Sequence, residues 1–417
     1  MNDITSDVAV IGGGPAGFAA ALAAQRAGAS VALIERCPFF GGNATAASVA
    51  AFCGLHTRGE TPDLAVRGIG GELLQLMEQR GYHLETCVSP ASGNTTTKFD
   101  PEELKLALDE MLEASGATAI THASFVDCAV EDGAVSSLLC CDDQGLFHVF
   151  AKQFVDATGN ASLIERAGGA TCWGDENGAV QQASLVFRIE GLPVRAIAPA
   201  ELKDAVVRGK AAGIECLGKE SGVIIKMDGD SFGYCTIPST DISDLSAPEL
   251  SAAEARLRRQ ARSYMEAFRR FIPDFSHAHI AGSGPSIGLR ESRRIKGSQT
   301  LEGEDILAGV KRDDSIARAA WSPEIHRSDA DPRYIHIPDN DYASIPLGAL
   351  EVPSVVNVWA SGRTISTDPL AFASVRVMGT AMATGQAAGV AAALSLDAPD
   401  VTASDVQKVL DAQHALY

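Results

Sequence analysis

Short apolar runs separated by glycines open the chain and predict a strand, a tight turn, a helix and a second strand. The first run covers residues 7–11, and glycines follow it at positions 12, 14 and 17. Residues 15–27 are rich in alanine and end at Gly28, which predicts a helix, and residues 30–34 form the second apolar run. Continuous apolar runs of this length are typical of strands buried on both faces of a parallel sheet.

The pattern changes twice further along the chain. Residues 100–115 have helical periodicity, with Asp100 and Pro101 as the helix start, and residues 118–155 predict short strands separated by turns. Residues 185–335 differ from both, because they mix strand-like runs with one long charged helix at residues 247–271.

The last part of the chain returns to the character of its start. We expect a strand at residues 355–360, a helix at 375–396 and a terminal helix at 402–416. An insertion between two halves of one nucleotide-binding domain explains this order better than a row of separate domains. The expected division is a nucleotide-binding domain from residues 1–184 and 336–417, and an inserted α+β cap, which contacts the substrate, from residues 185–335.

Composition and charge exclude several classes of protein. The 417 residues are 46% hydrophobic and carry a net charge of −19, which suits a large core and disfavours binding to nucleic acid. The nine cysteines form no Cys-x-x-Cys pair, which favours reduced thiols in a cytoplasmic protein over disulfides or a metal site. Residues 1–10 lack the basic and apolar regions of a secretory signal. Residues 377–396 carry no formal charge but are rich in alanine and glycine, so we expect a packed internal helix and no membrane span.

A glycine motif, Gly12-x-Gly14-x-x-Gly17, follows the first strand and opens the first helix. Gly12 permits a sharp turn, Gly14 lets the backbone approach a pyrophosphate, and Gly17 lets helix and strand pack closely. Free N–H groups and the helix dipole favour an anion at this place. Glu35 ends the second strand, where a carboxylate can accept both ribose hydroxyls of an adenosine. Together these features predict binding of an adenine dinucleotide.

Four further motifs extend this pattern along the chain. They are Gly-Gly-Asn-Ala-Thr at 41–45, Val-Asp-Ala-Thr-Gly-Asn at 155–160, Trp-Ala-Ser-Gly-Arg at 359–363 and Gly-Gln-Ala-Ala-Gly at 385–389. With them the chain resembles the glutathione-reductase-like FAD superfamily over nearly its whole length. Two more motifs, at 288–297 and 314–326, are similar to the branch of FAD-dependent oxidoreductases that includes tricarballylate-dehydrogenase-like and xanthan-lyase-associated flavoproteins.

The resemblance implies FAD as the cofactor and an α/β fold, in which the inserted cap joins a Rossmann-like FAD-binding domain. The helix that starts near Val375 would direct its N-terminus at the pyrimidine edge of the flavin, where its dipole stabilises negative charge on the reduced ring. The residues implied to contact FAD are Gly12, Gly14, Pro15, Ala16, Gly17, Glu35, Arg36, Gly42, Asn43, Ala44, Thr45, Val126, Ala157, Thr158, Gly159, Gly362, Arg363, Arg376, Val377 and Met378.

Three histidines are candidates for a base beside the substrate. His326 and His336 lie just before the chain re-enters the FAD-binding domain, and His56 follows the glycine loop at 41–45. Histidine suits proton transfer near neutral pH. The alternative for each of them is a purely structural histidine.

Arg290 is the candidate for binding a substrate carboxylate, because a guanidinium can hold such a group with two parallel hydrogen bonds. Arg293 would face a similar side one helical turn later. The alternative is that Glu291 pairs with a neighbouring arginine and braces the interface between the domains.

These features predict an FAD-dependent oxidoreductase that dehydrogenates or oxidises a small organic molecule, carboxylate-bearing if Arg290 holds an anion, by hydride transfer to flavin N5. The alternatives are a C=C reductase, a flavin monooxygenase and a non-catalytic electron-transfer subunit. Gly362 and Arg363 stand where aromatic hydroxylases carry Gly-Asp, which disfavours the monooxygenase, and no second nicotinamide-binding unit is recognisable. We expect oxygen, a quinone or another carrier as the electron acceptor and no metal, and we leave a homo-oligomer open.

Overall fold

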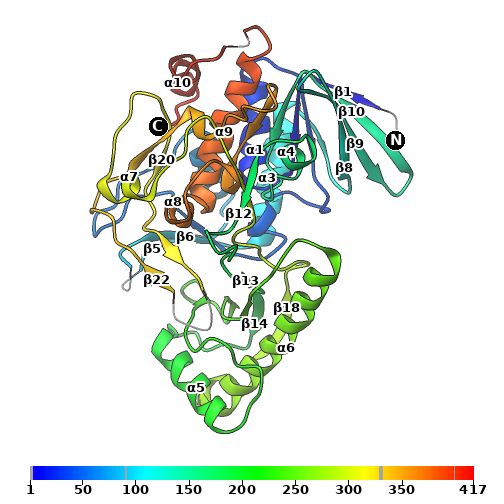
Figure 1. Ribbon diagram of the computed structural model, residues 1–417. Helices are drawn as coiled ribbons and strands as arrows, with labels where there is room; N and C mark the ends of the chain where they lie inside the picture. Colours follow the sequence, from blue (N-terminus) through cyan, green and yellow to red (C-terminus); the bar gives the residue numbers. More distant parts are fainter. Residues whose placement is uncertain (1–2, 90–91, 328–331, 399) are drawn as a thin grey trace.

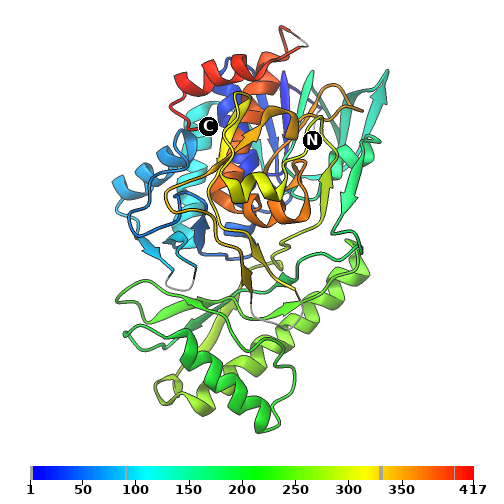
Figure 2. The ribbon, with the colours of Figure 1, turned by 60° about the vertical axis from the view of Figure 1, so that its left-hand side comes forward.

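The computed structural model describes residues 3–89, 92–327, 332–398 and 400–417, which form two parts (Figure 1). The upper part in Figure 1 carries both ends of the chain, and the lower part is the cap. The view in Figure 2 shows the same division, with strands and helices of both parts meeting along one boundary.

A five-stranded parallel sheet in the order β24-β11-β2-β3-β7 forms the centre of the larger part. The two apolar runs near the start of the chain are β2 (Val8–Ile11) and β3 (Val31–Ile34), and every residue of both is buried, as the sequence predicts. The other strands are β7 (Thr118–Ile120), β11 (Gln153–Asp156) and β24 (Val358–Ala360). One sheet therefore combines strands from both sides of the cap segment.

Two helices of small residues, α1 (Pro15–Arg26) and α9 (Met378–Leu394), lie side by side against this sheet (Figure 1). A Cβ at Gly385 or Gly389 would lie 2.1 Å from the carbonyl oxygen of Ala16 or Ala20, so only glycine permits this approach. Within the described residues, no single helix is long and apolar enough to cross a membrane, and one sharply bent pair, α8 (Pro369–Val375) with α9, passes by length and composition alone.

The helix expected at residues 375–396 is in fact two helices. α8 (Pro369–Val375) ends where the predicted helix begins, and α9 starts at Met378 after a bend of 95°. Val377 has an extended backbone and caps α9, and its side chain packs against Gly54, where a Cβ would lie 2.5 Å from it. The prediction of one continuous helix is wrong because Val377 and the nearby Gly379 pack at the break against Gly54, which is far away in the sequence.

The remaining elements of the larger part surround the sheet. Asp100 caps α3 by accepting a hydrogen bond from the N–H of Glu102, as predicted. An outer sheet contains β1 (Ile4–Thr5), β10 (Gly145–Phe150), β9 (Ala134–Asp142) and β8 (Ser124–Glu131), and a second contains β4 (Ala51–Cys53), β6 (Thr95–Phe99) and β5 (Leu84–Val88). The helices are α2 (Ile69–Gln79), α3 (Pro101–Ser115), α4 (Ser162–Arg166), α7 (Gly303–Ala308) and α10 (Ala403–Ala412). Paired short strands of the larger part are β12 (Thr171–Trp173) with β19 (Arg293–Ile295), β20 (Ser315–Ala319) with β23 (Ala343–Pro346), and β21 (Glu324–Ile325) with β22 (Arg333–Tyr334). A further pair, β13 (Ala183–Ser184) with β17 (Ser239–Thr240), belongs to the cap.

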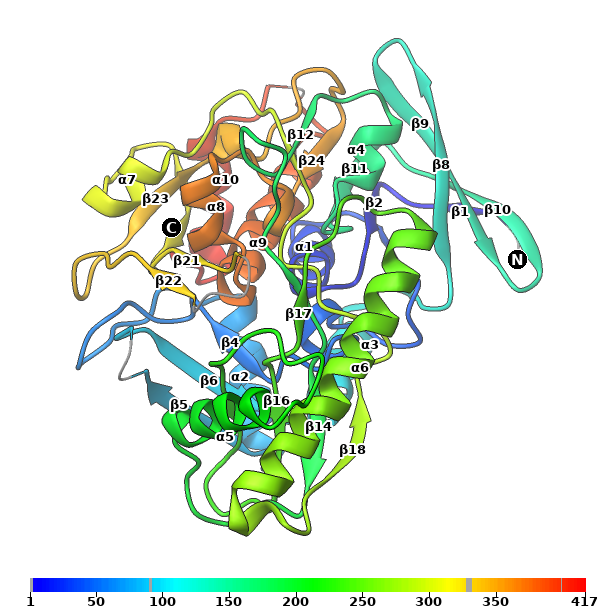
Figure 3. The same cartoon turned by 60° about the horizontal axis from the view of Figure 1, so that its bottom comes forward.

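The cap is a four-stranded antiparallel sheet covered by two helices (Figure 3). Its strands are β15 (Ile224–Ile225), β16 (Phe232–Cys235), β14 (Phe187–Glu190) and β18 (His279–Ser283), and its helices are α5 (Pro199–Ala211) and α6 (Ala247–Phe271). The bounds of α6 agree with the charged helix expected from the sequence. Leu257, Tyr264 and Phe268 form its buried face.

The hydrophobic cores place the cap boundary differently from the expected segment 185–335. The cap core contains buried residues between positions 180 and 289. Ile306 and Ile316, which lie inside the expected cap segment, pack instead in the core that contains α1 and α9. The chain thus returns to the larger part soon after residue 289, because α7 and β20 bury their apolar side chains there.

Candidate functional site

A cavity of about 570 Å³ lies where four strands of the parallel sheet end. Gly12, Glu35, Ala157 and Ser361 each directly follow a strand and line it, so it occupies the carboxyl edge of the sheet, the usual ligand position in such folds. Its volume falls in the range of roughly 300–1,000 Å³ that is common for small-molecule and cofactor sites. The predicted residues that line it are Gly12, Gly14, Pro15, Ala16, Glu35, Arg36, Gly42, Asn43, Ala157, Thr158, Gly159, Gly362, Arg363, Arg376 and Met378.

The glycine turn has the geometry that its motif implies. Gly12 has a φ of +96°, and a Cβ there would lie 2.5 Å from the carbonyl oxygen of Ala157. At Gly17 a Cβ would lie 1.7 Å from the carbonyl oxygen of Gly12, so Gly17 packs under the turn and does not line the cavity. A Cβ at Gly14 would meet only Gly42 Cα, at an ordinary 3.7 Å. No protein atom therefore requires glycine at position 14, whereas a ligand that approaches the backbone would.

Glu35 is buried at the end of β3 and helps to shape the turn. Its Oε2 accepts a hydrogen bond from the N–H of Gly13, and its Oε1 accepts one from the N–H of Cys37, both at 2.7 Å. A carboxylate has about four acceptor positions, so two remain for hydroxyl groups. The predicted contact between Glu35 and a ribose is compatible with this arrangement and stays a prediction.

The loop that follows β11 depends on a residue that the sequence reasoning did not select. Asp156 is fully buried and accepts four hydrogen bonds, from the N–H and hydroxyl of Thr158 and from the N–H groups of Leu163 and Ile164. These bonds fix Thr158 and Gly159 against the cavity. The Val-Asp-Ala-Thr-Gly-Asn motif contains Asp156, but only the fold shows that its carboxylate faces inward.

Arginines give the cavity a positive charge in an otherwise acidic protein. Arg363 donates to the carbonyl oxygen of Gly159 at 2.6 Å, and burial, followed by the nearby charges of Arg36 and Arg376, lowers its pKa to about 10. No carboxylate of the described residues lies within 4 Å of the Arg363 or Arg36 guanidinium. An open Gly14, the start of α1 and these cations together fit a bound pyrophosphate.

Five of the predicted cofactor residues do not line this cavity. Gly17 lies under the turn, Ala44 is in the core, and Thr45 donates its hydroxyl to the carbonyl oxygen of Phe40 at 2.7 Å. Val377 packs on Gly54. Val126 falls at a bulge of β8, and its neighbours Ser124 and Phe125, not Val126, line an adjoining cavity of about 210 Å³ that also reaches Glu35.

The cap roofs the cavity with residues that no sequence motif marked. Leu250 and Glu254 of α6 line it, together with Ile287 and Leu289 from the segment that leaves the cap. The side chain of Asn43 donates to the carbonyl oxygen of Leu289 at 3.2 Å, which joins the two parts across the site. These roof residues reach the cavity only through the packing of the cap, so no sequence motif predicted that they line it.

Arg290 and His326 come together beside the Arg376 end of the cavity, with Glu324 between His326 and Arg376. Glu324 Oε1 lies 3.1 Å from His326 Nε2 and accepts a hydrogen bond from the Tyr334 hydroxyl at 2.7 Å. The other carboxylate oxygen lies 3.7 Å from Arg376, which also donates to the backbone oxygen of Glu324 at 3.0 Å. Sequence reasoning quoted Glu324 in a motif but did not select it as a site residue, because its partners come from three separate segments.

Burial and mutual charge set the protonation of this group, which we call the Glu324 cluster (Arg290, Glu324, His326, Tyr334 and Arg376). Burial and then the charge of Arg290 lower the pKa of His326 to about 3, so its ring is neutral at pH 7. Burial would raise the pKa of Glu324, but His326, Arg376 and the Tyr334 hydroxyl hold it well below its usual range. Burial, followed by Arg376, lowers the pKa of Arg290 to about 10, so it remains cationic. The cluster thus holds two arginines and one carboxylate, and only Arg376 lies within 4 Å of that carboxylate.

Arg290 is held by the cap backbone and by no carboxylate of the described chain. Its guanidinium donates to the carbonyl oxygen of Gln182 at 2.6 Å. Residues 290–292 are not helical and Arg293 begins β19, so the expected helical relation between Arg290 and Arg293 is wrong. The bracing alternative applies to Arg294, which forms a buried ion pair with Glu291 at 2.5 Å. Within this motif Arg294 therefore braces the structure, whereas Arg290 is a cation without a carboxylate partner among the described residues.

The other two histidine candidates, His56 and His336, form no contact with the Glu324 cluster among the hydrogen bonds and ion pairs of the described residues. His336 is exposed on the surface. His56 is half-buried, its Nδ1 has no partner among the described residues, and burial lowers its pKa. Burial and then Glu35 raise the pKa of Cys37 to about 11, and all nine cysteines are free thiols. Within the described part of the chain, no group of side chains has the arrangement of a metal site.

The chain is similar to known proteins in both sequence family and fold. The family model described as FAD dependent oxidoreductase matches residues 7–416. A p-nitrophenol 4-monooxygenase from Pseudomonas putida shares 13% identity and superposes with a TM-score of 0.51, covering 99% of this chain and 84% of that one. A flavin-dependent brominase shares 15% identity with a TM-score of 0.51, covering 98% and 84%. These two structures show the common fold, and no curated protein matches this sequence significantly.

Proposed function

The chain belongs to the family of FAD-dependent oxidoreductases, and we propose that it oxidises a small, carboxylate-bearing organic molecule at the Glu324 cluster. It is an enzyme whose cofactor is FAD. The observation that carries the proposal is the half-buried guanidinium of Arg290, which no carboxylate of the described residues approaches within 4 Å. A buried cation is costly unless a partner compensates it, and a substrate carboxylate is such a partner.

The residues that would hold FAD line the cavity at the strand ends. Gly14 and the start of α1 would receive the pyrophosphate, Glu35 the adenosine ribose, and Arg363 and Arg376 the half nearer the Glu324 cluster. Bound FAD supplies an acceptor for a hydride and its two electrons. Leu250, Ile287 and Leu289 place apolar side chains against the cavity and would shield bound FAD from water.

Charge balance in the Glu324 cluster favours an anionic substrate. With His326 neutral, the two arginines and one carboxylate of these five residues leave one net positive charge among them. A carboxylate would take two parallel hydrogen bonds from the Arg290 fork and orient the C–H bond that is to be broken. The rest of the protein, at a net charge of −19, repels anions at long range, so this local cation is what would retain the substrate.

Substrate binding would also prepare a proton acceptor. His326 directs Nε2 to the Glu324 carboxylate, which places a proton on Nε2 and leaves the lone pair on Nδ1, 3.5 Å from Lys219 Nζ. The charge of Arg290 is one of the causes that lower the pKa of His326. A carboxylate bound to Arg290 offsets that charge, so the basicity of Nδ1 would rise when the substrate is present. Nδ1 could then accept the proton that leaves as the hydride departs.

The test is Arg290→Lys, which keeps a positive charge and loses the planar fork. We expect normal FAD content and a loss in kcat/KM of roughly ten- to a hundredfold, which corresponds to about 1.5–3 kcal/mol for a charged hydrogen bond. Arg293→Lys is the matched control, because Arg293 lies outside the Glu324 cluster and 3.6 Å from Glu165. Unchanged kinetics together with a lower melting temperature in Arg290→Lys would make this arginine a structural brace.

A flavin monooxygenase is the second candidate, favoured by the fold shared with the p-nitrophenol 4-monooxygenase. Stopped-flow reduction of the flavin separates the two functions. For the proposed dehydrogenase or oxidase, substrate reduces the flavin without oxygen, NADPH alone reduces it slowly, and oxygen or a quinone reoxidises it. Rapid reduction by NADPH would favour the monooxygenase.

A further inference from the structure

One face of the cap helix α6 carries arginines that no other part of the described chain neutralises. Arg259, Arg262, Arg269 and Arg270 are exposed, and at 100° per residue they fall, with Glu266, within about 100° of the helix surface. None of these four forms an ion pair within 4 Å with a described residue. The other arginines of the helix differ, because Arg256 pairs with Glu249 and Arg258 with Glu254. We call the four unpaired side chains the arginine face.

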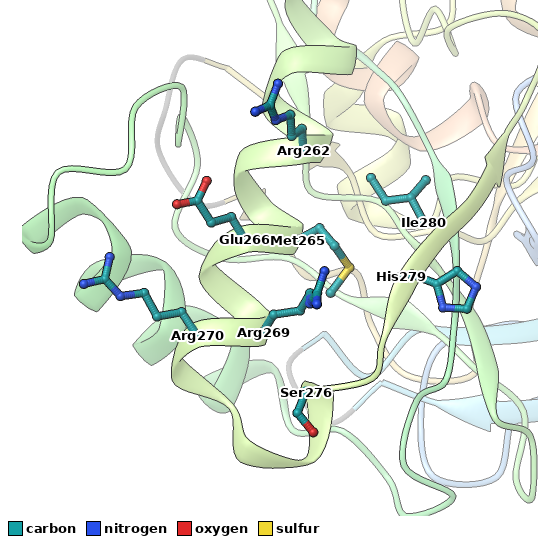
Figure 4. Close-up of a pocket in the computed structure, with 8 residues that line it drawn as sticks. All are labelled: Arg262, Met265, Glu266, Arg269, Arg270, Ser276, His279 and Ile280. Carbon is teal, nitrogen blue, oxygen red and sulfur yellow. The ribbon is translucent and has the colours of Figure 1, made fainter.

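A groove of about 590 Å³ runs between the arginine face and strand β18. Met265 and Ile280 line it with apolar side chains, and Arg262, Arg269 and Arg270 outnumber its single carboxylate, Glu266. Figure 4 shows Arg269 between the helix and the strand, with His279 and Ile280 on the strand opposite it. The groove is separate from the cavity at the strand ends, since the two share no lining residue.

The second wall of the groove is a free sheet edge. β18 is the outermost strand of the cap sheet and pairs only with β14 among the described strands. All five of its residues are exposed. The outer N–H and C=O groups of such an edge are ready to pair with another extended chain.

We propose that this groove binds an extended acidic segment of a partner protein, which adds as a strand to β18 and places its carboxylates against the arginine face. Backbone pairing to an edge strand supplies affinity in this mode of recognition, and side-chain contacts supply specificity. A small anion would use the arginines but not the strand edge. A second copy of this chain, paired edge to edge at β18, would bring two arginine faces together, and like charges disfavour that arrangement.

The experiment uses the FAD-loaded enzyme and a fluorescein-labelled peptide of alternating glutamate and valine, eight residues long. We expect saturable binding by fluorescence anisotropy that weakens as NaCl is raised. Arg269→Glu replaces an attraction by a repulsion and should weaken binding about fivefold. The control Arg67→Glu changes an exposed arginine of the other part of the protein and should leave the affinity unchanged.

Hydrogen exchange distinguishes strand addition from simple charge attraction. The outward-pointing amides among residues 279–283 should exchange more slowly in the complex, because an added strand bonds to them. Binding without this protection, equal binding of a lysine–valine peptide, or an equal effect of Arg67→Glu would overturn the proposal. Absence of saturable binding, or self-association that Arg269→Glu abolishes, would overturn it too.

Discussion

His326 makes the stability of this enzyme depend on pH in a way that can be calculated from its surroundings. Its ring is buried, and burial together with Arg290 lowers its pKa from 6.5 to about 3. The unfolded chain therefore takes up a proton on this histidine below about pH 6.5, while the folded protein does not. A depressed folded-state pKa contributes stability that is present above pH 6.5 and is lost as the pH falls toward 3.

The size of the effect follows from linkage. One pH unit below the unfolded pKa costs about 1.4 kcal/mol of unfolding free energy, provided that the folded form stays neutral. Between pH 7.5 and pH 5.5 we therefore expect His326 to account for a loss of about 1.4 kcal/mol. The range stops at 5.5 because the sequence pI is about 4.9 and proteins near zero net charge precipitate.

The assay compares the wild type with His326→Gln by urea unfolding at both pH values in the same excess of FAD. Glutamine can still donate to Glu324 but does not titrate, so the loss on acidification should be smaller in the variant by about 1.4 kcal/mol. His336→Gln, at an exposed position, is the control and should behave as the wild type. An equal loss in wild type and His326→Gln would show that His326 is protonated in the folded enzyme and refute the reasoning.

Two further predictions concern the turn and the brace. Gly14→Ala should unfold like the wild type but lose FAD absorbance on gel filtration, because its Cβ meets no protein atom closer than 3.7 Å and would meet only the ligand. Gly17→Ala should instead lower the melting temperature, because its Cβ would lie 1.7 Å from a carbonyl oxygen. Retention of FAD by folded Gly14→Ala would contradict the expected contact between Gly14 and the cofactor. Arg294→Met should destabilise the fold by about 3–5 kcal/mol in chemical denaturation, because it leaves the Glu291 carboxylate buried without its 2.5 Å partner; a change below about 1 kcal/mol would show that Glu291 finds another partner.

The sequence predicted the parts of this protein that depend on neighbouring residues. The strand, turn and helix at residues 7–34 were predictable because period, glycine positions and strand length agree within one short unit. Helix α6 was predictable because its N-cap and its long amphipathic repeat are local signals. The same reasoning placed fifteen of the twenty expected cofactor residues on the cavity wall.

The parts that the sequence did not predict depend on contacts between distant segments. The break before α9 depends on Gly54 and Val377, which are more than 300 residues apart. The Glu324 cluster joins β21, β22, the start of α9 and the segment that leaves the cap, and no spacing rule connects these pieces. Burial also changed the protonation expected for His326, because a histidine that would titrate near neutrality in water stays neutral here down to about pH 3.

The pairing of α1 with α9 has a consequence for how the chain is made. α9 begins about 350 residues after α1 ends. At about 5–20 residues per second, a ribosome needs roughly 20–70 s to produce the partner that covers the small-residue face of α1. The cap, whose core is complete by residue 289, can fold during that interval. Arg363 and Arg376 are also made late, so the nascent protein acquires its cap first and the complete wall of the cavity at the strand ends last.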